Sequence, residues 1–109
     1  MIRHYILDAH GDPEPCEDLL RWAHFLEYDE RRIVRQQRWR SVDPAVGEVF
    51  VSTVFLGIDH NFGDGPPVLW ETMAWIGDEE ICQRRWTSRT DAIAGHNAIV
   101  AELGGPVLE

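Results

Sequence analysis

The fold is decided by residues 48–58, which read EVFVSTVFLGI. Apolar side chains occur at both odd and even positions of this run, so as a strand it would be apolar on both faces. Its valines and phenylalanines favour extended backbone. A strand that is apolar on both sides belongs in the middle of a sheet, with at least part of each face covered. The sequence therefore predicts a central strand here, and the other elements are placed relative to it.

Downstream, residues 59–67 contain two glycines and two prolines and predict a loop. Alternating side chains over 68–76 predict the next strand. Gly77-Asp78 predicts a tight hairpin turn into an antiparallel strand over 80–86. Three strands joined in this way favour a meander.

A helix is expected after the last strand. Its N-cap is predicted at Thr87 or Ser88, because Ser88 is followed three residues later by Asp91, as in a capping box. The apolar stripe of this helix consists of Ala92, His96, Ile99, Val100 and Leu103. The Gly-Gly-Pro sequence at 104–106 predicts its end. On this stripe, His96 is expected to be a hydrogen-bonded core histidine.

Upstream of the central strand, residues 2–8 predict a first strand, and a helix is expected next, with Pro13 and Pro15 at its entrance. The apolar face of this helix is expected to consist of Cys16, Leu19, Leu20, Ala23 and Leu26, widened by Trp22 and Phe25. Residues 31–40 are assigned to a strand rather than a helix because of their β-favouring residues, and 41–47 to a loop.

The predicted order is therefore β-α-β-β-β-β-α within a single domain spanning residues 1–109. The fold class is α+β, with an antiparallel meander of four to five strands. Two amphipathic helices are expected to cover one face of the sheet. The other face, if uncovered, would permit a homodimer.

The charge is unevenly distributed along the chain. Residues 1–30 carry −6, residues 31–40 carry +5 and residues 41–109 carry −8, for a net charge of −9. An acidic protein lacks the excess of cations that neutralises the phosphates of nucleic acid, so no direct nucleic-acid binding is expected. No apolar run approaches the roughly 18 residues that cross a bilayer, and the N-terminus lacks the apolar segment of a signal peptide. A cytoplasmic protein without membrane contact is expected.

Few residues suggest catalysis. Asp8 and His10 form a D-x-H pattern, but no second group with ligand spacing completes a metal site. The thiol of Cys16 has no histidine partner that the sequence identifies. Gly63-x-Gly65 lacks the Lys-Ser/Thr ending of a phosphate-binding loop. We therefore expect no metal, no cofactor and no catalytic residue, and binding is favoured over enzymatic activity.

Two segments supply candidate binding residues. In and after the stiff loop at 59–67, the candidates are Asp59, His60, Asn61, Phe62, Trp70 and Glu71. The alternative is a rigid connector in which His60 only satisfies backbone carbonyls. In the arginine-rich run, Arg35, Arg38 and Trp39 are candidates for a contact surface. The alternatives for that run are a solvated edge or neutralisation by the acidic first helix.

Four pieces of the chain resemble one family. They are residues 51–73 (VSTVFLGIDHNFGDGPPVLWETM), residues 5–8 (YILD) before the proline-rich turn, residues 20–27 (LRWAHFLE), and Trp86-Thr87-Ser88 with residues 92–96 (AIAGH). Together they resemble a family of small uncharacterised proteins of tailed bacteriophages and prophages. Residues 38–47 and Arg89 depart from the family pattern. The resemblance implies a phage origin and a shared fold, and it implies no reaction.

These observations predict a small acidic phage accessory protein that acts by binding in the infected bacterial cell, in host takeover or in counteracting host defence. Its target would be a host protein or a small nucleotide-like ligand. One alternative is a small enzyme that acts on a phosphorylated ligand through Asp59, His60 and Glu71. Another is a minor structural or assembly protein of the virion.

Overall fold

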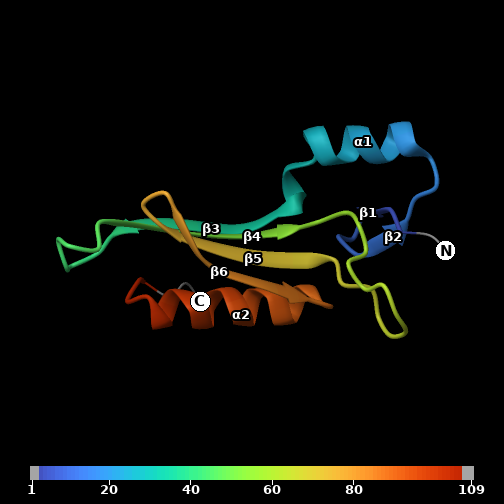
Figure 1. The fold of residues 1–109 in the computed structure, drawn as a ribbon. Coiled ribbons are helices and arrows are strands. Elements are labelled where there is room, and N and C mark those ends of the chain that lie inside the picture. Colours follow the sequence, from blue (N-terminus) through green and yellow to red (C-terminus); the bar gives the residue numbers. More distant parts are fainter. Residues whose placement is uncertain (1–2, 107–109) are drawn as a thin grey trace.

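The computed structural model describes residues 3–106, and within them it contains six strands, two α-helices and one short 3₁₀ helix (Figure 1). In chain order they are β1 (Tyr5–Leu7), β2 (Pro13–Pro15), α1 (Leu19–Tyr28), η1 (Glu30–Arg32), β3 (Ile33–Arg40), β4 (Glu48–Phe55), β5 (Trp70–Ile76), β6 (Glu79–Trp86) and α2 (Arg89–Glu102). Strands β1 and β2 pair in a small antiparallel sheet, and β3 to β6 form a four-stranded antiparallel meander. The α+β class is confirmed.

The central strand is β4, which pairs with β3 on one side and with β5 on the other. It ends at Phe55, three residues before the predicted end, because Gly57 adopts a φ of +75° and turns the chain. A Cβ at Gly57 would also lie 2.7 Å from a terminal methyl group of Leu26, so the Leu26 side chain would have to move. Beyond this turn, Ile58 makes an isolated bridge to His4.

Helix α2 covers one face of the meander. Ile99 and Val100 pack there against Val49, Val51 and Ala74. Ser88 caps the helix as predicted, its hydroxyl accepting a hydrogen bond from Asp91 N at 3.0 Å. The helix lies so close to the sheet that a Cβ at position 95 would come within 2.2 Å of the Trp86 ring. Only glycine fits there.

Within residues 3–106, only α2 lies across the meander, which corrects the expectation that both helices cover one face of the sheet. Figure 1 shows α2 along one side of the meander and α1 near the end of the sheet where β4 leaves it. Phe25 of α1 contacts Phe55 at that end, with 5.9 Å between ring centroids. Most of the second face therefore has no helix across it among residues 3–106.

The buried face of α1 also differs from the prediction. Phe25 is buried and Trp22 and Leu26 are half-buried, whereas Leu19 and Leu20 are 58% and 84% exposed. Ala23 is also exposed. Cys16 is buried, but it lies before the helix, whose N-cap is Asp18. The large aromatic side chains determine the orientation, because Trp22 Nε1 donates a hydrogen bond to Gly57 O at 2.9 Å.

Residues 13–15, expected at a helix entrance, instead form strand β2. Proline lacks an N–H group but fits extended backbone at a sheet edge, which is where β2 lies. Asp8 organises the turn between β1 and β2, because its Oδ1 accepts hydrogen bonds from the backbone N–H groups of His10 and Asp12. The predicted start of the first strand, Ile2, lies outside the described residues. Neither described helix is both long enough and apolar enough to span a membrane.

Candidate binding surface

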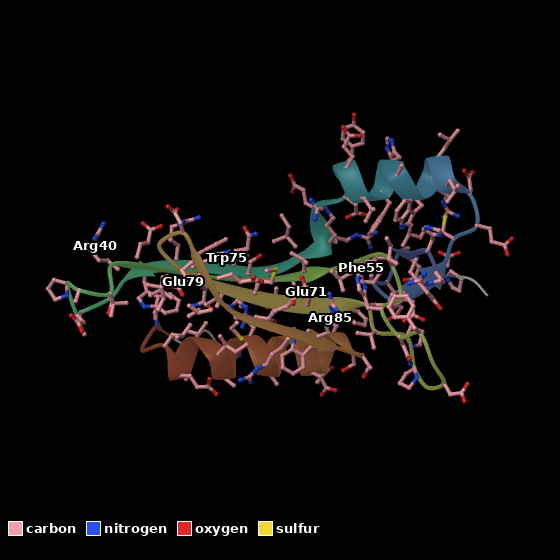
Figure 2. All side chains as sticks on the ribbon, in the orientation of Figure 1. Arg40, Phe55, Glu71, Trp75, Glu79 and Arg85 are labelled. Atoms are coloured by element: carbon pink, nitrogen blue, oxygen red, sulfur yellow. The ribbon has the colours of Figure 1, made fainter. Side chains whose placement is uncertain are left out.

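The sheet face opposite α2 is the strongest candidate for a functional surface, and we call it the open face. Because side chains alternate along a strand, the residues between those that meet α2 point to this face. It comprises Gln36, Arg38 and Arg40 of β3, Glu48, Phe50, Ser52 and Val54 of β4, Glu71, Met73 and Trp75 of β5, and Glu80, Gln83 and Arg85 of β6. Figure 2 shows side chains over the whole sheet, with Trp75, Glu71 and Arg85 labelled.

A row of four residues crosses the open face, one from each strand. The strand register places Arg38 opposite Phe50, Phe50 opposite Trp75 and Trp75 opposite Glu80. The Phe50 and Trp75 rings stack, with centroids 5.5 Å apart and planes 21° apart. The Arg38 guanidinium lies 4.2 Å from the centroid of the Phe50 ring, a cation–π contact. We call this row the Arg38–Glu80 row.

Most charges on the open face are already paired within it. Glu71 is only 8% exposed, and its Oε2 accepts hydrogen bonds from Arg85 Nε and Gln83 Nε2, both at 2.9 Å. Arg38 forms an ion pair with Glu48. The face carries three arginines, at 38, 40 and 85, and three glutamates, at 48, 71 and 80. It is therefore electrically neutral in a protein of net charge −9.

The predicted arginine surface is divided between the two faces of β3. Arg38 belongs to the open face. Arg35 points to the α2 side, where its Nη1 donates a hydrogen bond to Asn97 Oδ1 at 2.9 Å. Trp39 also lies on the α2 side and packs with the core cluster that includes Val49. The structure therefore does not bring these three candidates together, since neighbouring residues on a strand point in opposite directions.

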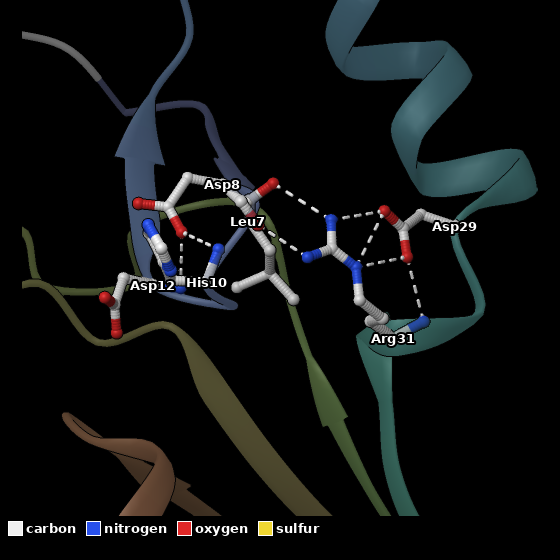
Figure 3. A network of polar contacts seen from close by, with 6 residues as sticks. All are labelled: Leu7, Asp8, His10, Asp12, Asp29 and Arg31. Atoms are coloured by element: carbon white, nitrogen blue, oxygen red, sulfur yellow. Dashed lines mark hydrogen bonds and ion pairs between the residues drawn. The ribbon is translucent and has the colours of Figure 1, made fainter.

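Arg31 has a structural role near the start of β3. Its guanidinium bonds to the Asp29 carboxylate and to the carbonyl oxygens of Leu7 and Asp8, which joins η1 to the small sheet (Figure 3). The Arg31 side chain holds the pKa of Asp29 below its ordinary value. Backbone N–H groups of Asp12 and His10 lower the pKa of Asp8. The Asp8 carboxylate of the D-x-H pattern therefore accepts hydrogen bonds within a turn.

Within residues 3–106, no group of three or more His, Cys, Asp or Glu side chains is placed to hold a metal ion.

In the loop at 59–67, the polar side chains bond to the loop itself. Asp59 Oδ1 accepts hydrogen bonds from the backbone N–H groups of Asn61 and Val68, at 2.7 and 2.9 Å. Asn61 Nδ2 donates to the carbonyls of Asp64 and Pro66. Its Oδ1 accepts a bond from Gly63 N at 2.9 Å. These two side chains therefore hold the loop in shape.

The other candidates from this segment each make different contacts. His60 Nδ1 contacts the carbonyl of Ile58 at 2.9 Å. Phe62 is 75% exposed, and the Arg3 guanidinium lies 4.3 Å from the centroid of its ring. Trp70 is buried against Phe55 in the core, whereas Glu71 points to the open face. The common mouth expected for Trp70 and Glu71 is therefore not formed, because the two adjacent residues face opposite sides of β5.

A hydrogen-bond chain that is buried at Thr72, Thr53 and His96 crosses the sheet beneath α2. It runs from Trp86 Nε1 through Thr72 Oγ1, Thr53 Oγ1, His96 and Gln37 to the Pro106 carbonyl, with distances from 2.6 to 3.0 Å. The indole only donates and the carbonyl only accepts, so every link has one direction and the proton of His96 sits on Nε2. Burial first, and the Arg35 guanidinium second, lower the pKa of His96 to about 4.

Two surface grooves lie away from the open face. One, of about 630 Å³, lies between α1 and the segment at residues 29–31. The other, of about 740 Å³, lies beside the N-terminus of α2 and is lined by His10, Asp12 and Arg31. In both grooves Arg31 is already bound to Asp29 and to backbone carbonyls. Of the predicted binding residues, only Trp70 lines either groove.

The chain matches no known family model, no curated protein and no solved structure. Sequence reasoning identified Arg38 and Glu71 but missed Phe50, Met73 and Trp75. The sequence does carry a signal for these three residues. They are large apolar residues at alternate positions of β4 and β5, on the face that α2 does not cover.

Proposed function

We propose that this protein acts by binding another protein through the open face, and that it is not an enzyme. The observation that carries the proposal is the Arg38–Glu80 row, in which a stacked phenylalanine and tryptophan lie on a sheet face without a helix across it. Aromatic, methionine and arginine side chains are the types enriched at protein interfaces. The open face supplies all of them, with Phe50, Trp75, Met73 and Arg38 as neighbours.

The charge of the open face favours a protein partner. Nucleic acid requires an excess of cations to neutralise phosphates, and this face has equal numbers of arginines and glutamates. A small ligand needs a concave site, and both grooves lie elsewhere. A neutral surface with paired charges and central aromatic rings fits the flat apolar centre of a protein interface.

Binding through the face is also favoured over pairing through the sheet edges. Each edge strand, β3 and β6, contains an irregularity in register. Both strands also carry arginines, at 35, 38 and 40 in β3 and at 84 and 85 in β6. Bulges and charged side chains discourage the addition of another strand.

The resemblance to phage and prophage proteins suggests the biological setting. We infer that the partner is a host protein and that the protein works in the cytoplasm of the infected cell, as an accessory factor in host takeover or against host defence. The enzyme alternative is less well supported, because Asp59 holds the loop while Glu71 bonds to β6. Nothing specific favours a virion component.

Site-specific photo-cross-linking tests the proposal. A photoreactive phenylalanine analogue is placed at Phe50 on the open face or, as a control, at Ala98, which is exposed on α2. We expect a discrete adduct with a host protein in infected cells from position 50 only, and loss of that adduct when Trp75→Glu is added. Equal adducts at both positions, or none at position 50, would contradict the proposal.

A further inference from the structure

We propose that in the free protein the open face is covered by a second copy of the chain, in a two-fold, face-to-face dimer that the target must displace. This inference rests on the proposed role of the open face as a binding surface and names what occupies it before the target arrives. Self-association would then regulate access to the binding surface.

The Arg38–Glu80 row is complementary to itself. Its order across the sheet is positive, aromatic, aromatic, negative, in steps of one strand. A two-fold axis that runs along the strands, between β4 and β5, places β3 of one protomer over β6 of the other. Arg38 then faces Glu80 of the second copy, and Phe50 faces Trp75. The same contacts form twice, as a closed dimer requires.

Net charge restricts where two copies can meet. Each chain carries −9, so contact between acidic surfaces is repulsive. The open face is neutral, and at physiological salt charges more than about 8 Å away are largely screened. Glu71 and Arg85 already bond to each other, as do Arg38 and Glu48, so a dimer would not bury these charges unpaired. The open face therefore allows close approach of a second copy.

The size of the face fits a weak dimer. Four strands spaced about 4.8 Å apart and about eight residues long give a footprint of roughly 500 Å² per protomer. Two such footprints bury roughly 1,000 Å², the lower limit for a specific interface. A contact of this size is reversible at cellular concentrations, which would let a target with a larger or better-fitting surface replace the second copy.

Sedimentation velocity over a concentration series tests the dimer. Wild-type protein should shift from monomer to dimer as concentration rises. In Arg38→Glu and in Glu80→Arg, like charges would face each other twice, so each variant alone should dimerise at least about tenfold more weakly. An equimolar mixture of the two variants should regain a dimer, because positions 38 and 80 are then both acidic in one copy and both basic in the other. The control variant is Glu102→Arg, at an exposed position on α2, and it should behave as wild type.

The outcomes separate this inference from the proposed function. A wild-type monomer at all concentrations, or single variants that dimerise like wild type, would overturn the dimer. The proposed function would still stand if Phe50 cross-linked to a host protein. Binding of a single-stranded oligonucleotide that Trp75→Glu abolishes would overturn both, since the face would then serve nucleic acid. Thermal unfolding of each variant checks that the fold is intact.

Discussion

At the scale of single residues, His96 connects pH to stability. Its imidazole is fully buried, and both ring nitrogens have partners. A proton added at Nδ1 would meet Thr53 Oγ1, which now donates to that nitrogen, so the hydrogen bonds between His96 and Thr53 and between Thr53 and Thr72 would have to reverse. Neutral His96 is therefore part of the folded structure.

The first prediction follows from this pKa. The folded protein binds the His96 proton at a pH of about 4, and the ordinary histidine value is 6.5. Between these values His96 is protonated in the unfolded chain and neutral in the folded protein. Its contribution to the free energy of unfolding is therefore fully present above pH 6.5 and is lost as the pH falls toward 4. The loss is about 3 kcal/mol, since one pKa unit corresponds to about 1.4 kcal/mol. Urea unfolding at a series of pH values measures it.

His96→Gln is the matched variant for this measurement. It should be less stable at neutral pH but should lose most of the pH dependence between 6.5 and 4. The lowered pKa values of Asp8 and Asp29 act in a separate range, because their stabilisation is present above the ordinary value of 3.8 and is lost as the pH falls below it. An unchanged slope in His96→Gln would contradict the assignment.

The second prediction concerns Asn61. Its side chain makes three hydrogen bonds that close the loop at 59–67. Asn61→Ala should lower the free energy of unfolding by about 1 to 3 kcal/mol. Phe62→Ala, the neighbouring control, should cost less than about 1 kcal/mol because its ring is exposed and contacts only Arg3 among the described interactions. If Phe62→Ala weakens target binding while stability holds, the loop belongs to the binding surface after all.

At the scale of elements, helix α1 provides the third prediction. Phe25→Ala should destabilise the protein by about 3 to 5 kcal/mol, because it removes a buried ring that packs on Phe55. Leu20→Ala should cost less than about 0.5 kcal/mol, since Leu20 is 84% exposed. Chemical denaturation of both variants distinguishes the two orientations of the helix. A larger loss for Leu20→Ala than for Phe25→Ala would contradict this orientation of α1.

The elements also show how far sequence reasoning reached. The strands around β4 and β5 and the cap of α2 could be predicted because local alternation, turn residues and Ser88 all agree. The orientation of α1 could not, because Trp22 and Phe25 take their places from Gly57 and Phe55, which are distant in sequence. Nor could strand β2, because two prolines suit either a helix entrance or a sheet edge.

The candidate site was less predictable than the fold. Arginine density in β3 suggested one surface, but the alternation of a strand sends Arg35 and Arg38 to opposite faces. The composition of the loop at 59–67 suggested a binding site, yet Asp59 and Asn61 are engaged in holding its shape. Which face of the sheet lacks a helix depends on tertiary packing, and only the structure gives it.

At the scale of the whole molecule, the open face is a neutral surface on a chain of net charge −9. Helix α2 covers one side of the meander and α1 lies near its end (Figure 1), and Phe50 and Trp75 on the other side are half-buried. Charge on the rest of the surface keeps unrelated contacts apart. We propose that this face is where the protein binds.

Fluorine NMR tests that claim most directly, because the five tryptophans lie in different places. The protein is labelled with ring-fluorinated tryptophan, and Trp75→Phe identifies the Trp75 signal. Spectra are compared between dilute buffer and an extract of infected cells, the setting proposed above for this protein. We predict that the Trp75 signal shifts or broadens while those of Trp22, Trp39, Trp70 and Trp86 keep their positions. An unchanged Trp75 signal, with movement at any of the other four, would contradict the account.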